Sequence, residues 1–339
     1  MNDISEAIKI AGSEIQTGER KDIRLKVSES FVSNPTFIQL TVIKGIKTGP
    51  VLLVTAAVHG DELNGIEIVR RLIHYISPDD ISGTVICVPV VNIYGFQNAT
   101  RYLPDGHDLN RFFPGNPDRW SQGRYAHTIF SELVLKSDFI IDLHTAAAGR
   151  SNLPHIRANM TMPDVARMAK AFGTTVVLDY IGTEGSLRRS ATDAGIPAIT
   201  LEAGETRKFE KKIAEKGLLS VFNVMRELKM LDGEVREPQY QIVVNRTSWV
   251  RANRGGILSF NTRPGRIVKK GKELATYTNP FGTEVESIKA PFNGVVIGVA
   301  TAPTVVPGEG VCHLFKLDEP VGKVRQKLME LFGKKRIVF

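Results

Sequence analysis

Four short apolar runs constrain this chain more than any other feature. Each is continuous rather than alternating in hydrophobicity and rich in β-branched residues, as expected of strands covered on both faces. The runs are Pro50–Val58, Thr84–Val91, Asp138–His144 and Pro197–Ala203. They therefore predict a sheet that lies between layers of helices.

Helical patterns separate these runs. The segment "ELNGIEIVRRLIHYI" places apolar residues at helical spacing, and "RYAHTIFSELVLK" and "MPDVARMAKAFG" do the same, with Pro163 suited to a helix start. Strands and helices thus alternate along residues 1–235. We predict an α/β catalytic domain over this range, with a mixed, mostly parallel sheet flanked by helices.

The composition shifts after this range. From Tyr240 to about Lys316 the chain has short β-like runs separated by glycine and proline, as in "GGILSFNTRPGRIVKKGKELATYTNPFG". We predict a smaller all-β domain at 240–320, with residues 228–240 as the connection. The remainder, 321–339, is a basic tail, which we interpret as a solvated face rather than a patch for an anionic partner. Its cations are Lys323, Arg325, Lys327, Lys334, Lys335 and Arg336.

Bulk properties exclude several classes of protein. No apolar run approaches the roughly 20 residues that span a bilayer, and the N-terminal segment lacks a secretory pattern. Cys87 and Cys312 are the only cysteines, which excludes a disulfide framework and fits a reducing compartment. The net charge of +8 is accompanied by no nucleic-acid motif. We predict a cytoplasmic protein with no membrane or nucleic-acid partner, and assembly into a homo-oligomer is compatible with the sequence.

Metal-ligating residue types stand where three of the runs end. His59 and Glu62 follow the first run, His144 ends the third and Glu202 ends the fourth. Ligands of open α/β sheets bind outside the carboxyl ends of the strands. Two histidines and one carboxylate with an open fourth position are typical of a hydrolytic zinc site. We also expect Gly60 to supply an unusual backbone conformation in the His-x-x-Glu loop.

A polar loop follows the second run, "PVVNIYGFQNATRYLPDGHDLNRFFPG". It brings Arg101, Asp108, Asn110 and Arg111 within eleven positions. Loops on a rigid scaffold often carry function, and arginine binds carboxylates through two parallel hydrogen bonds. A solvated surface loop is the alternative. Asp142, two residues before His144, either orients a metal ligand or bonds to backbone.

The motifs "HGDE", "RYLPDGHDLNR", "DLHT" and "LEAGE" together resemble the succinylglutamate desuccinylase/aspartoacylase family, a branch of the zinc carboxypeptidase-like hydrolases. The resemblance implies that His59, Glu62 and His144 hold one zinc ion per chain. It implies that Glu202 takes a proton from the metal-bound water and passes it to the leaving amine. It further implies that Arg101 polarises the scissile carbonyl, that Asn110 and Arg111 grip the substrate's α-carboxylate, and that Asp108 orients its neighbours.

The same resemblance extends to two less certain regions of the chain. An arginine of the segment before Glu202 can bind a second substrate carboxylate in the family, which points to Arg188 or Arg189, although both residues also fit a helix face. The loop between Arg101 and Asn110 is longer than in the aspartoacylase branch and adds His107, which favours another branch. The small β domain resembles biotinyl/lipoyl carrier domains, but the stretch "ATYTNPFGTEVES" at the carrier position has no lysine to modify.

These features predict a zinc-dependent amidohydrolase that removes an acyl group from a small N-acyl amino acid or a related amide. The substrate would be a small molecule that bears a carboxylate. Two alternatives stay open. One is a zinc carboxypeptidase that acts on peptides, and the other is a non-catalytic metal-binding interaction protein.

Overall fold

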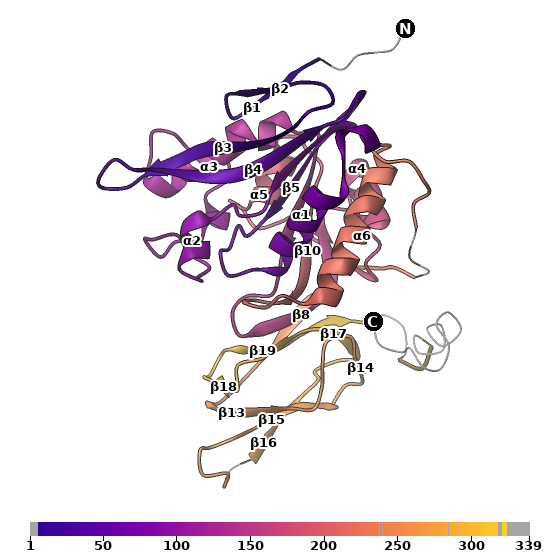
Figure 1. Cartoon of the computed structure of the whole chain (residues 1–339). Coiled ribbons are helices and arrows are strands. Elements are labelled where there is room, and N and C mark those ends of the chain that lie inside the picture. Colours follow the sequence, from indigo (N-terminus) through magenta and orange to yellow (C-terminus); the bar gives the residue numbers. More distant parts are fainter. Residues whose placement is uncertain (1–5, 237, 239, 284, 318–320, 324–339) are drawn as a thin grey trace.

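The fold is built on one large mixed sheet. A computed structural model describes residues 6–236, 238, 240–283, 285–317 and 321–323. Within this part, ten strands of a 13-stranded sheet lie in the order β12-β19-β17-β8-β10-β7-β5-β6-β4-β3. Figure 1 shows this sheet running through the molecule, with helices packed against its upper part and a second β layer below.

The four predicted runs form the parallel centre of the sheet. They are β5 (Lys47–Ala56), β6 (Ser82–Val88), β7 (Phe139–His144) and β10 (Ala198–Glu205). Strand β5 pairs in parallel with β6 and β7, and β7 pairs in parallel with β10. All four therefore point their carboxyl ends toward the same edge of the sheet, as predicted.

Antiparallel strands extend this centre on both sides. On one side, β3 (Arg20–Glu29) and β4 (Pro35–Lys44) form a long hairpin that pairs with β6, and the small hairpin of β1 (Ile8–Ile10) and β2 (Ser13–Ile15) lies nearby. On the other side, β8 (Arg150–Ala158) pairs with β10, and β9 (Val176–Asp179) pairs with β8. The sequence analysis identified none of these strands.

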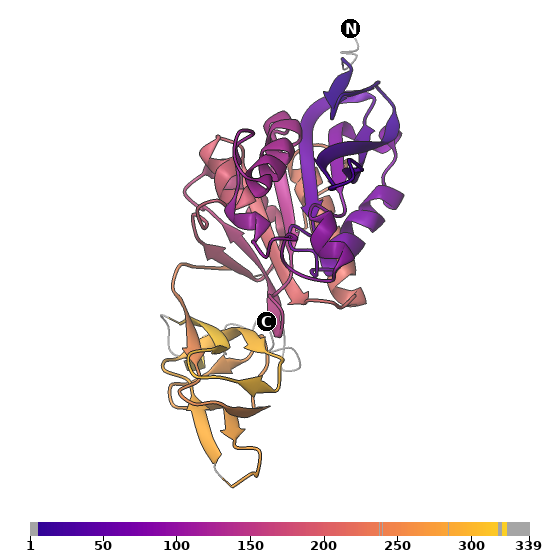
Figure 2. The same cartoon turned by 90° about the vertical axis from the view of Figure 1, so that its left-hand side faces the viewer.

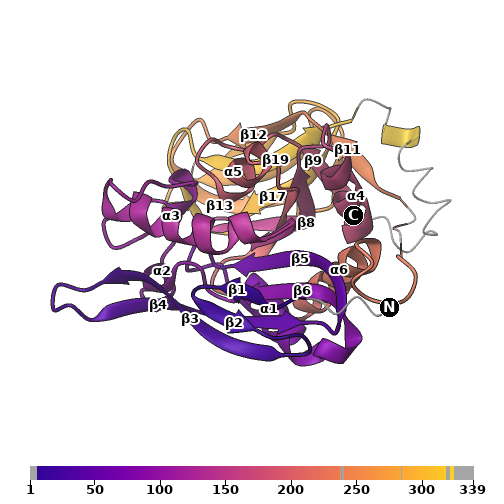
Figure 3. The same ribbon diagram turned by 90° about the horizontal axis from the view of Figure 1, so that it is seen from above.

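Helices cover both faces of the sheet, with an apolar core beneath each layer. On one face lie α1 (Asn64–Tyr75), α4 (Pro163–Phe172) and α6 (Lys211–Glu227), whose apolar side chains join one buried cluster. A second cluster includes side chains of α3 (Ser121–Glu132) and α5 (Leu187–Asp193). Figure 3 shows α3 on one side of the sheet and α1 and α6 on the other. The remaining helical segments are short: α2 (Ile93–Gln97), η1 (Pro78–Asp80), η2 (Leu109–Arg111) and η3 (Val134–Lys136).

The C-terminal part is a β structure in two layers (Figure 2). One layer belongs to the large sheet and contains β12 (Thr247–Arg251), β14 (Ile267–Val268), β17 (Gly294–Ala300) and β19 (Gly310–Lys316). The other is a four-stranded antiparallel sheet of β13 (Gly256–Phe260), β15 (Glu273–Thr278), β16 (Val285–Lys289) and β18 (Thr304–Val305). Strand β11 (Ile242–Val244) pairs with β9 instead.

The C-terminal layer joins the catalytic sheet through one strand pair. Residues 298–300 of β17 pair antiparallel with residues 150–152 of β8. One edge of β8 thus pairs with β10, while the other is shared between β17 and β9. The predicted boundaries of the two domains remain a prediction, because hydrogen bonds run continuously between the two parts.

Two of the expectations concern segments at the margin of the structure. Of the basic tail at 321–339, residues 324–339 lie outside the described part of the chain, so the interpretation of its cations rests on sequence alone. Among the described residues, the longest helices are too short or too polar to cross a bilayer.

Candidate metal centre and active site

The loop after β5 carries the first two candidate ligands into the protein interior. His59 and Glu62 are 3% and 1% exposed. The chain leaves the strand through Ala57, whose φ of 50° is unusual for a residue other than glycine. Gly60 does not have a positive φ, so our expectation for it was wrong. It is required for close approach instead, because a Cβ there would collide with the backbone of Gly95 and Phe96.

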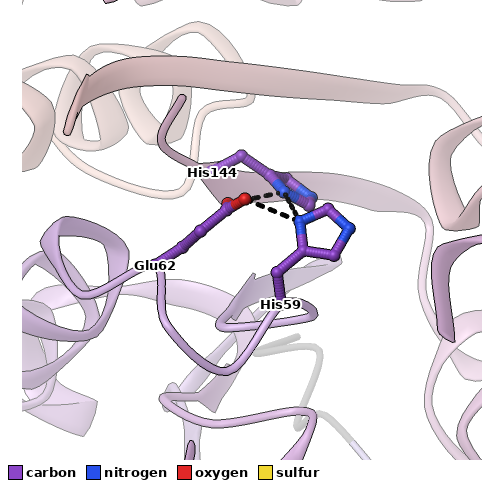
Figure 4. A group of neighbouring side chains, drawn as sticks. All are labelled: His59, Glu62 and His144. Carbon is purple, nitrogen blue, oxygen red and sulfur yellow. Dashed lines mark hydrogen bonds and ion pairs between the residues drawn. The ribbon is translucent and has the colours of Figure 1, made fainter. Parts of the chain in front are cut away.

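Three side chains converge at the carboxyl ends of β5 and β7 (Figure 4). His59 Nδ1 lies 2.7 Å from Glu62 Oε1, and His144 Nδ1 lies 2.9 Å from Glu62 Oε2. The two Nδ1 atoms are 3.1 Å apart. One ligand atom from each residue fits within 4.8 Å of the others, and all three residues are buried. The cluster is therefore compatible with a metal site.

The outer nitrogens of both imidazoles face carboxylates. His59 Nε2 lies 3.2 Å from Asp108 Oδ1, and His144 Nε2 lies 2.7 Å from Asp142 Oδ2. In the tautomer that donates to these acids, both Nδ1 lone pairs point at each other and at Glu62. Such a set of facing lone pairs is repulsive unless a cation lies between them. The donor chemistry therefore fits a divalent ion, with each histidine oriented by an acid in the manner common for metal ligands.

Electrostatics in this cluster keep the acids charged. Burial disfavours the Glu62 carboxylate, but His59 and His144 outweigh it and lower its pKa below the ordinary value. Burial also opposes the charged form of His144, yet Asp142 and Glu62 raise its pKa well above the ordinary value. The pKa of Asp108 is lowered as well, because His59 and Arg101 outweigh its burial. Three ionised carboxylates around two imidazoles form a strongly cation-attracting centre.

Asp142 orients His144 rather than bonding to backbone. Its Oδ2 faces His144 Nε2, while its Oδ1 accepts a hydrogen bond of 2.8 Å from the Thr55 hydroxyl. We expect Asp142→Asn to weaken metal binding about 10- to 100-fold, since the partner of His144 loses its charge. Competitive zinc titration measures this change. Asp138→Asn, at the exposed other end of the same strand segment, should bind zinc like the wild type, and equal affinity of both variants would contradict this role for Asp142.

Arg101 is fixed beside the cluster by Asp108. Its Nη2 and Nε donate to Asp108 Oδ2 at 2.8 and 3.2 Å, and its Nη1 lies 3.4 Å from Glu62 Oε1. Burial opposes its charge, but Asp108 and Glu62 raise its pKa above the ordinary value. Asp108 also caps the η2 segment by accepting from the Asn110 backbone N–H at 2.9 Å. One carboxylate thus positions His59, Arg101 and the start of the "LNR" segment together.

Glu202 lies next to His144 because their strands are in register. Glu202 of β10 and His144 of β7 are paired neighbours in the parallel ladder. The strand continues three residues beyond Glu202, with a bulge between Glu202 and Gly204, so this residue does not end it as predicted. Two residues of β8 hold the carboxylate: Asn152 donates to Oε2 at 3.1 Å, and the Arg157 guanidinium lies 3.4 Å from Oε1.

All of these groups face one cavity of about 230 Å³. A space of this size suits a small molecule rather than a long chain. Its lining includes Glu202, the three candidate metal ligands and a set of arginines: Arg101, Arg111, Arg150, Arg157 and Arg188. Outside the metal cluster, positive groups dominate the wall, which favours an anionic ligand.

The predicted substrate-binding residues divide into two groups. Asn110, Arg111 and Arg188 line the cavity, and Asn110 Oδ1 accepts from the Leu187 backbone N–H at 2.8 Å. Burial, together with Arg157, lowers the pKa of Arg188 to about 10, and its guanidinium donates to the Tyr180 carbonyl at 2.9 Å. Arg189 instead pairs with Asp193 at 2.7 Å and is not part of the lining, and neither is His107.

Sequence reasoning missed several groups that line the cavity. Asn152, Arg157 and Tyr180 come from β8 and the end of β9, and Trp249 and His313 come from the C-terminal part. The polar letters of "RSNLPHIR" were the available signal for the first two, since a buried strand rarely carries so many polar groups without a function. Trp249 and His313 had no such signal.

His155 is a buried histidine of β8 that titrates far from its ordinary range. Its Nδ1 donates to the Leu153 carbonyl at 2.8 Å, while Nε2 is buried without a partner in the described structure. Burial and the nearby Arg157 lower its pKa to about 3, and burial lowers that of His313 to about 3 as well. Both rings are therefore neutral in the folded protein at neutral pH.

This difference makes the fold sensitive to acid. In the unfolded chain these histidines bind protons below about pH 6.5, whereas the folded chain cannot until about pH 3. We expect each ring to remove about 2 kcal/mol of stability between pH 6.5 and pH 5. Urea unfolding at pH 7 and pH 5 measures the loss. His155→Asn should retain about half of the slope, because His313 remains, and an unchanged slope would contradict this account of His155.

Taken together, the fold and the cluster define a class: an α/β protein with a metal-binding His-Glu-His centre at the carboxyl ends of its parallel strands. Sequence comparison then gives the family. The profile of the succinylglutamate desuccinylase/aspartoacylase catalytic domain matches residues 48–228, more than half of the chain. The chain belongs to this family, as the motifs predicted.

Individual relatives agree with this assignment. The chain is 27% identical over 303 residues to an Nα-acetyl-L-2,4-diaminobutyric acid deacetylase of Halomonas elongata, covering 84% of this chain and 87% of that protein. The product-bound ectoine utilization protein EutE (DoeB) of Ruegeria pomeroyi has the same fold, with a TM-score of 0.81 at 22% identity, over 94% of this chain and all of that one. A succinylglutamate desuccinylase of Silicibacter sp. TM1040 gives a TM-score of 0.79 at 23% identity, over 92% and 98% of the two chains.

Proposed function

We propose that this protein is a zinc-dependent amidohydrolase that removes the acyl group from a small N-acyl amino acid. The observation that carries the proposal is the adjacency of a buried His-Glu-His cluster and Glu202 in one arginine-lined cavity. His59, Glu62 and His144 would hold one ion. When bound, zinc would acidify water and polarise a carbonyl group. The deacetylase activity named for the Halomonas elongata relative agrees with this proposal.

Glu202 is the proton carrier in this proposal. As the water oxygen attacks the amide carbon, Glu202 accepts a water proton, and it then delivers this proton to the nitrogen as the C–N bond breaks. The products are a carboxylic acid and a free amine. Asn152 and Arg157 hold the carboxylate in one orientation, so that a single carboxyl group serves both steps.

Arginines stabilise the negative charge in this proposal. Arg101, held by Asp108 next to Glu62, is placed to stabilise the oxyanion that develops on the amide oxygen. Asn110 and Arg111 would bind the α-carboxylate of the amino acid, and Arg188 a second anionic group. The alternatives fit less well: a cavity of about 230 Å³ is small for a peptide, and a purely structural metal site does not require a neighbouring unligated glutamate.

Metal content and amine release together test the proposal. We expect about one zinc per chain by elemental analysis, and turnover of at least one member of a panel of N-acetyl, N-formyl and N-succinyl amino acids, lost on chelation and restored by zinc. Nα-acetyl-2,4-diaminobutyrate belongs in the panel because of the Halomonas relative. Release of C-terminal residues from ordinary peptides, or binding of no metal even when it is supplied, would overturn the proposal.

The location of the protein in the cell is part of the same proposal. Cys87 and Cys312 are both free and buried, and burial raises the pKa of each thiol to about 12. Two unpaired thiols agree with a reducing compartment such as the cytoplasm.

A further inference from the structure

The C-terminal part contributes two aromatic side chains to the cavity of the catalytic part. Trp249 of β12 and His313 of β19 are paired neighbours in an antiparallel ladder, and both line the cavity. Their rings stack at a centroid distance of 4.7 Å and an angle of 4°. The Arg150 guanidinium lies 4.7 Å from the centroid of the Trp249 ring. These contacts fix the orientation of a flat surface at this side of the cavity.

His313 has polar ring atoms that the described structure does not use. The residue is 7% exposed, and within the described part of the chain its ring nitrogens have no hydrogen-bond partner. A buried polar group without a partner is costly unless a ligand or water satisfies it. Because His313 lines the cavity, a bound ligand is within reach of this ring.

This aromatic surface is connected to the proton carrier. Gly298 of β17 is paired with Asn152 on one side and His313 on the other. A Cβ at Gly298 would lie 2.8 Å from Asn152 Oδ1 and 3.4 Å from the His313 Cβ, so only glycine lets these side chains approach each other. Asn152 in turn donates to Glu202. The wall therefore begins at the carboxylate that acts on the scissile amide and continues through His313 to Trp249.

The candidate carboxylate-binding groups belong to a different side of the cavity. Asn110 and Arg111 lie in the η2 segment, which is hydrogen-bonded to the start of α5 through Leu187, and Arg188 lies in α5. If the amino-acid half of the substrate is bound there, the acyl half extends toward the wall formed by Asn152, His313 and Trp249.

We propose that His313 and Trp249 contact the acyl half of the substrate and determine which acyl groups this enzyme accepts. The flat indole supports the acyl group, and a ring nitrogen of His313 hydrogen-bonds to it. Neutral rings suit this role, because they add hydrogen bonding without competing with the arginines for the carboxylate. This inference rests on the proposed function and assigns the acyl specificity of the same site.

Matched substrate pairs test the assignment. One set varies the acyl group on a single amino acid, and the other varies the amino acid under a single acyl group. We expect His313→Phe, which keeps the stacked ring but removes its nitrogens, to change the ratio of kcat/KM between acyl groups by about tenfold, roughly one buried hydrogen bond. The ratio between amino acids and the zinc content should stay within about twofold. His74→Phe, at an exposed position of α1, is the control.

Fluorescence gives a second readout that does not require turnover. The chain has two tryptophans, and Trp120 is 72% exposed and outside the cavity lining, so Trp120→Phe leaves Trp249 as the single emitter. We expect the zinc-free protein carrying this substitution to change its emission when titrated with an N-acyl amino acid that the wild type turns over. Adding Trp249→Phe should abolish the signal.

The outcomes separate this inference from the proposed function. Turnover by the wild type with an acyl-group ratio that His313→Phe leaves unchanged would overturn the acyl assignment alone. A changed ratio between amino acids with a constant ratio between acyl groups would do the same, as would unaltered Trp249 emission. If the wild type turns over no member of the panel, the proposed function fails, and the acyl assignment fails with it.

Discussion

Replacing Glu202 by glutamine is expected to reduce kcat by about 10²- to 10⁴-fold while the protein keeps its metal and its fold. The amide has nearly the same shape and can still accept the hydrogen bond from Asn152, which is 3.1 Å from Oε2 in the wild type. It cannot accept the water proton or deliver it to the leaving nitrogen. The measurement is steady-state amine release together with zinc content per chain.

The control for this variant lies three residues further along the same strand. Glu205 bonds to the Thr301 hydroxyl and the Lys208 ammonium and does not line the cavity, so Glu205→Gln should turn over substrate like the wild type. If Glu202→Gln retains more than a tenth of wild-type kcat, Glu202 is not the proton carrier. If it loses its zinc as well, Glu202 is part of the metal centre instead.

Replacing His144 by alanine is expected to remove zinc binding and the stability that depends on it. The imidazole supplies one of the three converging ligand atoms and is the partner of both Glu62 and Asp142. Zinc at a hundredfold excess over its Kd should stabilise the wild type by about 3 kcal/mol, and the variant should show no such gain. Urea unfolding with and without zinc, together with metal content after dialysis, checks both expectations.

His74→Ala is a suitable control for that variant, because His74 is exposed near the end of α1 and far from the cluster in its contacts. It should bind zinc and gain stability like the wild type. Retention of one zinc per chain by His144→Ala would refute the ligand assignment. A loss of stability without any loss of zinc would mean that His144 serves packing rather than coordination.

The central strands and the metal cluster could be predicted because both follow from short-range patterns. Continuous apolar runs identify strands that are covered on both faces, and their carboxyl ends must meet at one edge. His59 and His144 were therefore expected to be neighbours, although 85 residues separate them, and their ring nitrogens lie 3.1 Å apart.

Strands with weaker patterns escaped the sequence analysis. In β3 the buried residues Ile23, Leu25 and Val27 alternate with exposed ones, a period-two signal that was available but is easily outweighed by the many charges between them. Strand β8 contains Pro154 and five polar residues, so its local sequence does not favour a strand. Its position is determined by pairing with β10, β9 and β17, which a local pattern cannot show.

The contribution of Trp249 and His313 could not be predicted for a related reason. Neither residue has a neighbour in sequence that marks it as functional, and both reach the cavity only because β17 pairs with β8 across about 150 residues of chain. Likewise, the choice of Arg188 over Arg189 as a cavity residue depends on the orientation of α5, since adjacent positions on a helix point about 100° apart.

The pairing of β17 with β8 also bears on how this protein avoids aggregation. A strand with one unpaired edge is a template onto which another chain can add. Here residues 150–152 of β8 are covered by β17 and residues 156–158 by β9, so nearly the whole of that edge is occupied. A chain shortened to residues 1–235 would expose the backbone groups beside the catalytic centre. The C-terminal part thus protects the sheet against edge-to-edge association, and the two parts are expected to fold and be inherited as one unit.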